Sequence, residues 1–248
     1  LVGAGYHKEL DYKSYDFTES DLDKEIYLDT ITSMGGKEKA TLRQVLDIMR
    51  ESYCGSIDVE YMHIQEMEER AWMQKNVEGV DYKSEYSPKL RRAIYKDLVE
   101  AEGFETYLQM KHTGTKRFGL DGGESLIPFM ERMLRSAATV GVEEVVIGMP
   151  HRGRLNVLAR TMGKPYVAIF SEFQGNSAHP EDVQGSGDVK YHLGASADRD
   201  FSEGAMHLSL TANPSHLECV NPVVLGKVRA KQAQRGDEAR EKVMGLIM

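Results

Sequence analysis

The residues best suited to chemistry are a histidine and two arginines in the run MPHRGRLN at positions 149–156. The run ends an apolar stretch, residues 144–149, that we expect to be a strand, and it opens a predicted helix at 155–162. Ligands of open α/β sheets bind at the carboxyl ends of strands, and a helix N-terminus favours anions. The guanidiniums of Arg152 and Arg154 suit a phosphate or carboxylate. We therefore predict an anion site, with His151 as a proton carrier beside it.

Two further segments place a histidine in a similar setting. His192 closes the stretch GSGDVKYHLG at 185–194, whose glycines allow backbone to approach a ligand, although a solvated loop is the alternative interpretation. Ser215 and His216 follow a predicted strand at 206–211 and open a helix, where Ser215 is either a site residue or only the helix cap. If the two strands are neighbours, their ends meet at one crevice.

The elements that must position these residues alternate between helix and strand from about residue 111 onward. The apolar periodicity predicts helices and strands that follow one another along the chain: helices at 124–139, 155–162, 167–173 and 215–234, and strands at 144–149, 206–211 and 243–248. Such alternation is typical of a mainly parallel sheet covered by helices. The predicted fold class is therefore α/β, preceded by an N-terminal helical region.

The first 110 residues have a different pattern. Residues 1–40 are polar and weakly patterned, and we expect an extended arm or linker. Residues 41–110 predict a small helical domain, with a first helix at 41–53 capped by Thr41 and a second at 65–76. A third helix starts at Pro88 and is expected to break at Gly103. Residues 111–248 form the remaining, incomplete domain.

Composition excludes several classes of protein. The 248 residues carry a net charge of −8, which argues against a nucleic-acid partner. The sequence has no apolar run of the roughly 18–20 residues that cross a bilayer, so we expect no membrane partner. The two cysteines have no metal-type spacing and favour a reducing compartment. A serine hydrolase built on Ser215 would lack the nucleophile-elbow pattern.

Five segments together resemble the 2-oxoglutarate dehydrogenase family, the thiamine-dependent decarboxylating component of that complex. They are GMPHRGRLNVL at 148–158, GSGDVKYHLG at 185–194, LTANPSHLE at 210–218, YCGSIDVEYMHI at 53–64 and KRFGLDGGESLIP at 116–128. The resemblance covers nearly the whole chain. It implies that residues 111–248 are the N-terminal part of a mainly parallel α/β domain that binds thiamine diphosphate.

The resemblance also implies residue roles. His151 and His192 match active-site histidines, and His192 would hold the oxo acid. Arg152 matches an arginine that contacts the cofactor phosphates and lies near the substrate carboxylate. Ser215 and Leu217 match residues that line the thiamine and substrate pocket. Mg²⁺ is the second implied cofactor, but the family's metal-binding motif, which begins His-Gly-Asp, is expected beyond residue 248, so no metal ligand is assigned here.

The implied activity is oxidative decarboxylation of 2-oxoglutarate in the tricarboxylic acid cycle. The succinyl group would pass to the lipoyl domain of the partner dihydrolipoyl succinyltransferase. The protein would be a homodimer in the bacterial cytoplasm, or alternatively in the mitochondrial matrix. Because the chain starts at Leu1 and ends in an apolar run, we expect a fragment. Since the resemblance places the metal-binding motif and later domains beyond residue 248, we expect this fragment to be inactive alone. A 2-oxoadipate dehydrogenase, whose substrate is one methylene longer, and a non-catalytic α/β anion-binding module remain alternatives.

Overall fold

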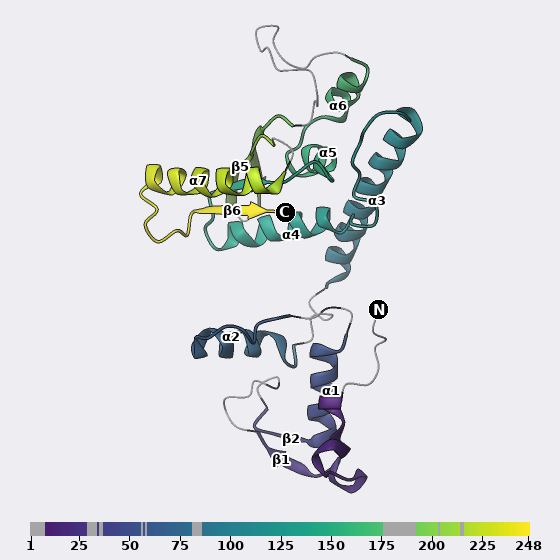
Figure 1. The fold of residues 1–248 in the computed structure, drawn as a ribbon, viewed down its shortest axis with the longest axis vertical. Helices are drawn as coiled ribbons and strands as arrows, with labels where there is room; N and C mark the ends of the chain where they lie inside the picture. The colour runs from purple at the N-terminus through teal and green to yellow at the C-terminus, as the bar shows by residue number, and fades with distance from the viewer. Residues whose placement is uncertain are drawn as a thin grey trace. The chain divides into compact units, whose positions relative to one another are not determined.

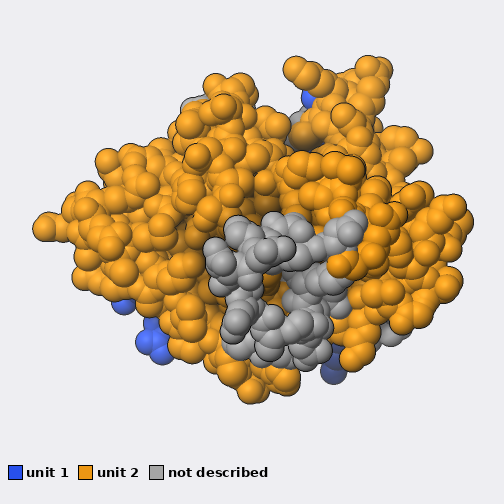
Figure 2. Space-filling view, turned by 90° about the horizontal axis from the view of Figure 1, so that it is seen from above, with its two compact units in different colours: residues 1–87 blue, residues 88–248 orange. Residues whose placement is uncertain are grey.

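The computed structural model describes residues 8–28, 34, 37–55, 57, 59–80, 86–175, 192–202, 204–213 and 216–248. Ser215 and residues 185–191 of the predicted site lie outside these ranges. The chain divides into two compact units, residues 1–87 and 88–248, which have separate colours in Figure 2.

The first unit consists of short elements and two longer helices. In chain order they are η1 (Lys8–Leu10), η2 (Tyr12–Tyr15), η3 (Glu19–Asp21), β1 (Glu25–Tyr27), β2 (Lys39–Thr41), α1 (Leu42–Tyr53) and α2 (Met67–Val77). The strands β1 and β2 pair antiparallel within the stretch that the sequence predicts as an extended arm. Helix α1 begins at the predicted capping box, because Thr41 Oγ1 accepts the Gln44 N–H at 3.2 Å and Gln44 Oε1 accepts the Thr41 N–H at 3.1 Å.

The second unit contains the α/β elements together with the helix at 88–111, which the sequence analysis assigns to the preceding helical domain. Its elements are α3 (Pro88–Lys111), α4 (Leu126–Thr139), β3 (Glu144–Gly148), α5 (Arg154–Asn156), the π-helical turn η5 (Val157–Thr161), α6 (Tyr166–Phe173), β4 (Ala195–Phe201), β5 (Gly204–Leu210), α7 (Leu217–Arg235) and β6 (Val243–Ile247). Within the described residues, the strand order is β4-β5-β3-β6. β3 is parallel to β5 and β6, whereas β4 is antiparallel to β5. The mainly parallel sheet is confirmed, with β4 as an additional edge strand.

The two faces of this sheet have separate apolar layers. Val145 and Ile147 of β3 pack in a core with residues of α3 and α4, while Val146 between them packs with Val220 and Val224 of α7. Figure 1 shows α4 and α7 on opposite sides of the sheet. Because β3 is covered on both faces, its residues are all buried, as expected for the central strand of a parallel sheet.

Helix α3 does not break at Gly103, contrary to the sequence-based expectation, and is a single helix of 24 residues. Glycine inside a helix costs about 1 kcal/mol relative to alanine. The burial of Phe104 and Leu108 on the following turns, at roughly 1.5–3 kcal/mol each, outweighs that cost.

Neither α3 nor any other helix in the described part of the chain is long and apolar enough for a membrane crossing.

Candidate functional site

The ends of β3 and β5 lie side by side. Ile147 pairs with Leu210 in the parallel register, and the Thr211 N–H donates to the Ile147 carbonyl at 2.8 Å. The segment that carries His151 therefore leaves the sheet next to the segment that carries Asn213. This confirms the expectation that the two strand ends are neighbours, which is the condition for a shared crevice.

The His192 segment is fastened to the same place. The Asn213 N–H donates to the His192 carbonyl at 2.8 Å. A Cβ atom on Gly194 would lie 2.9 Å from the Leu210 carbonyl oxygen and 3.2 Å from the Ala212 nitrogen. Gly194 thus allows close approach to the backbone of residues 210–212, where the sequence analysis expected the glycines to approach a ligand. Three separate sequence segments meet at one end of the sheet.

Arg154 occupies the centre of this junction and has no exposed surface. Its Nη1 donates to the Met149 carbonyl at 3.2 Å, and its Nη2 donates to the carbonyls of Leu193 at 2.9 Å and Thr211 at 2.8 Å. Burial lowers the pKa of Arg154 to about 10, so the group is still charged at neutral pH. The sequence-based assignment of Arg154 to an anion is therefore wrong, because its guanidinium binds backbone carbonyls.

The start of α5 is also less open to an anion than its sequence predicts. The Gly153 N–H donates to the Phe118 carbonyl at 2.8 Å, and the Arg154 N–H donates to the His151 carbonyl at 3.2 Å. Gly153 has φ 72°, and a Cβ atom there would lie 2.3 Å from Leu120 Cδ2. The glycine lets the chain turn tightly against the 118–120 loop, whose Phe118 carbonyl accepts the Gly153 N–H.

Arg152 and His151 lie at the surface of the junction. Arg152 Nη1 donates to the Gly119 carbonyl at 2.9 Å and lies 3.4 Å from Asp121 Oδ2, and 58% of the side chain is exposed. The His151 and Phe118 rings have centroids 4.1 Å apart. Within the described ranges, both contacts of Arg152 use Nη1, which leaves Nε and Nη2 available to an anion.

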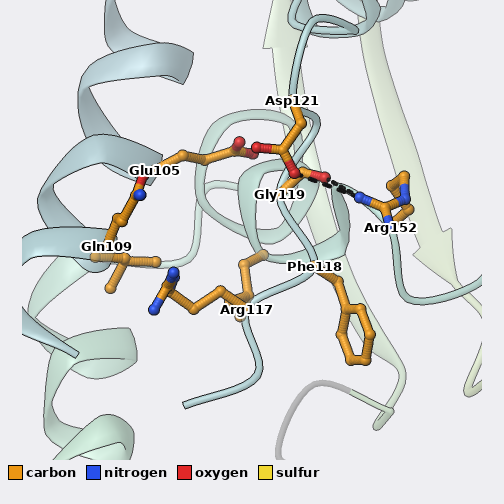
Figure 3. Close-up of a pocket in the computed structure, with 9 residues that line it drawn as sticks. Glu105, Gln109, Arg117, Phe118, Gly119, Asp121 and Arg152 are labelled. Atoms are coloured by element: carbon orange, nitrogen blue, oxygen red, sulfur yellow. Dashed lines mark hydrogen bonds and ion pairs between the residues drawn. The ribbon is translucent and has the colours of Figure 1, made fainter. Parts of the chain in front are cut away.

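A cavity of about 270 Å³ lies beside Arg152. Its polar lining comes from α3, from the loop after α3 and from the segment after β3: Glu105, Gln109, Arg117, Asp121 and Arg152. In Figure 3 the Glu105 carboxylate points toward Asp121, and Arg152 reaches the same loop from the other side. The anion candidate Arg152 thus has acidic neighbours, so a ligand anion must compete with Asp121 for its guanidinium.

Glu105 is a residue that sequence reasoning missed. Its carboxylate accepts the Leu120 N–H at 2.8 Å and the Asn156 Nδ2–H at 2.9 Å. Burial raises the pKa of Glu105, and the charge of Asp121 adds to this effect. The available signal was an acid four residues after buried Ala101 and three before buried Leu108, which places a carboxylate on the apolar face of α3.

The remaining predicted residues are less well defined. Leu217 opens α7, and 38% of its surface is exposed. The N-cap of α7 is His216. Ser215, predicted as a site residue or a helix cap, lies outside the described residues. Among the residues that the structure describes, there is no cluster of His, Cys, Asp and Glu side chains that could hold a metal ion.

Comparison with known proteins identifies relatives of the chain. Over 240 residues, which are 97% of this chain and 24% of the relative, it is 52% identical to the 2-oxoglutarate dehydrogenase E1 component of Brucella anthropi. With the same coverage it is 55% identical to the proteins of that name from Brucella canis and Brucella suis. No family model matches the chain. The chain spans only 24% of the length of these relatives, and it is similar to that segment of 2-oxoglutarate dehydrogenase E1 components.

Proposed function

We propose that the chain is part of an enzyme that oxidatively decarboxylates 2-oxoglutarate and passes the succinyl group to the lipoyl domain of a dihydrolipoyl succinyltransferase. The observation that carries this proposal is identity of 52–55% over 97% of the chain to proteins named for that activity. The junction of the three segments that carry His151, His192 and Asn213 supports it, because an active site needs such a convergence.

The proposed cofactor is thiamine diphosphate, which supplies the electron sink for decarboxylation when it is bound. The residues present fit this group at Arg152, whose exposed guanidinium retains Nε and Nη2 for a diphosphate or a carboxylate. Ser215 and Leu217 are proposed to line the same pocket. We propose that the ligands of the accompanying Mg²⁺ lie beyond residue 248 in the longer protein.

The two histidines are proposed to act on the substrate. A histidine side chain titrates near neutral pH and can therefore accept or donate a proton at the reacting oxygen. His192 would hold the oxo acid, and His151 would serve the proton transfers. The Asn213 N–H holds the backbone carbonyl of His192, and the Phe118 ring contacts the His151 imidazole.

We further propose that the protein acts as a homodimer in the bacterial cytoplasm. The organisms of the matching relatives are bacteria, which favours this location over a mitochondrial matrix. The resemblance to a family whose active sites lie between subunits supports the dimer. The name that these relatives share favours 2-oxoglutarate over 2-oxoadipate as the substrate.

The role of Arg152 is tested in the full-length protein with the variant Arg152→Ala. A lost charge-assisted hydrogen bond of about 1.5–3 kcal/mol weakens binding roughly 10–100-fold. We expect the KM for 2-oxoglutarate or the Kd for thiamine diphosphate to rise by that factor. Arg229→Ala, which removes an exposed guanidinium from α7, is the matched control.

The outcome that contradicts this role is Arg152→Ala with the kinetics of the wild type. The choice of substrate has its own test, in which turnover of 2-oxoglutarate and 2-oxoadipate is compared in the wild-type protein. A single methylene is worth only about 1–3 kcal/mol, so both acids can react, and the ratio of kcat/KM decides. Faster turnover of 2-oxoadipate would overturn the proposed substrate.

A further inference from the structure

We propose that Arg154 is a positioning residue of this active site, which sets the distance between the His151 and His192 segments. The inference rests on the proposed function for its kinetic consequences. It concerns a different residue and a different task from Arg152, because Arg154 is fully buried and its guanidinium contacts the backbone of the chain.

The contacts of Arg154 join three segments that are distant in the sequence. The Met149 carbonyl lies two residues before His151, and the Leu193 carbonyl directly follows His192. The third acceptor, the carbonyl of Thr211, lies two residues before Asn213, whose N–H in turn holds the His192 carbonyl. One guanidinium thus connects the ends of β3 and β5 with the histidine segment that packs against them.

The chemistry of arginine suits this task better than that of lysine. A guanidinium is planar and presents five N–H donors in a rigid fork, so one side chain can reach carbonyls in several directions. A lysine ammonium is a single point at the end of a flexible stem. Three carbonyls also give a buried cation the hydrogen bonds without which its burial would be strongly unfavourable.

A second arginine, Arg199, has only a structural role and can be compared with Arg154. Arg199 of β4 is partly buried, forms a bidentate pair with Glu131 at 3.0 Å for both bonds, and donates to the carbonyl of Thr161. These contacts tie β4 to α4 and η5, and none of them lies beside His151 or His192. Replacing Arg199 should therefore lower the thermal stability and leave the active-site geometry unchanged.

The experiment uses Arg154→Lys, Arg154→Met and the control Arg199→Lys in the full-length protein, at a temperature where circular dichroism shows each to be folded. A misplacement of about 1 Å in an active site can reduce the rate 100-fold. We expect both Arg154 variants to lose about 10–100-fold in kcat/KM for 2-oxoglutarate, while the Kd for thiamine diphosphate changes less. Arg199→Lys should lower Tm with kcat/KM unchanged. Unchanged kcat/KM in folded Arg154→Lys and Arg154→Met would overturn the proposal.

A second variant covers the case in which the Arg154 variants do not fold. Gly194→Ala places a Cβ atom against the Leu210 carbonyl and so displaces the His192 segment from the Arg154 guanidinium, while Arg154 itself is unchanged. It should give the same loss of kcat/KM, and normal kinetics would contradict the positioning role of this junction.

Hydrogen exchange separates this inference from the proposed function. If the wild-type protein does not turn over 2-oxoglutarate, the proposed function fails. The exchange rate of the Asn213 amide still measures the stability of its hydrogen bond to the His192 carbonyl. That amide should exchange faster in folded Arg154→Met, or in Gly194→Ala, than in Arg199→Lys. Equal exchange in the three variants would overturn the positioning role.

Discussion

At the scale of single residues, Glu105 stabilises a loop that backbone conformation alone disfavours. Phe118 and Asp121 have φ values of 46° and 43°, in the left-handed region that side chains other than glycine rarely adopt. Each such residue costs on the order of 1–3 kcal/mol. Glu105 accepts the Leu120 N–H between them, and Gly153 donates to the Phe118 carbonyl. The contacts of Arg152 and His151 with this loop thus depend on a carboxylate on α3.

The charge of Glu105 predicts a pH dependence of stability. Burial raises its pKa above the ordinary 4.5, so its contribution to folding is fully present below pH 4.5 and is lost as the pH rises through the raised pKa. The difference in unfolding free energy between the wild type and Glu105→Gln should therefore be largest near pH 4 and shrink toward pH 7. Urea unfolding at several pH values measures it.

Glu124 provides the control of opposite sign. Its carboxylate accepts the Gly122 N–H at 2.9 Å, which lowers its pKa. The stability that it contributes is present above the ordinary pKa and is lost as the pH falls. The difference between the wild type and Glu124→Gln should therefore grow with rising pH. For both variants, the difference in unfolding free energy from the wild type is plotted against pH. If the two differences changed with pH in the same direction, the assignment of the raised pKa of Glu105 to burial would be wrong.

At the scale of elements, the packing of α7 on β3 depends on Gly148. A Cβ atom there would lie 2.4 Å from Val224 Cγ2 and 2.8 Å from Val220 Cγ1. Overpacking of a core typically costs 1–3 kcal/mol. We expect Gly148→Ala to lower the free energy of unfolding by about that amount, and Val224→Ala in the same chain to restore part of the loss. Urea unfolding of the single and double variants tests this.

Gly226 in α7 is the matched control for this substitution. A Cβ atom there meets nothing within 4 Å. Alanine is favoured over glycine inside a helix by about 1 kcal/mol, so Gly226→Ala should raise the stability. A Gly148→Ala variant as stable as Gly226→Ala would show that α7 shifts freely on β3, and the packing argument would fail.

The same elements show which parts of the fold were predictable. The capping box at Thr41 and the alternation of Met206, Leu208 and Leu210 are local patterns, and both gave the correct element. β4 alternates between less and more exposed residues, but Arg199 takes one of the inward positions, so the apolar pattern is weak. Its pairing with β5 as an edge strand is a tertiary property. Local sequence also could not show that burial beyond Gly103 keeps α3 intact.

The candidate site was predictable in its location but only partly in its chemistry. The convergence of two strand ends follows from parallel topology, which periodicity indicates. The sequence pattern does not distinguish the roles of Arg152 and Arg154, because both lie in the same short run. Only the fold brings the carbonyls of Leu193 and Thr211 to Arg154. A buried carboxylate such as Glu105, 51 residues from its partner Asn156, is similarly invisible to spacing arguments.

At the scale of the whole molecule, the two compact units have separate hydrophobic cores. Leu28, Met34 and Ala40 form a cluster in residues 1–87. The largest cluster of residues 88–248 includes Leu208 of β5, which has no exposed surface, and its described members all belong to that unit. Because contacts within a core transmit destabilisation, each unit should respond to changes in its own core.

Hydrogen exchange with the variants Leu208→Ala and Leu28→Ala tests this independence in one protein. A buried leucine replaced by alanine costs about 2–5 kcal/mol, which speeds exchange of amides that open only by unfolding of the unit by roughly 30-fold or more. Leu208→Ala should accelerate the amides of β3 and leave those of α1 unchanged, because Leu208 packs in the core that contains Val145 and Ile147. Leu28→Ala should do the reverse, since Leu28 packs with Val45, Ile48 and Met49 of α1. If either variant accelerated α1 and β3 equally, the two units would unfold as one cooperative structure.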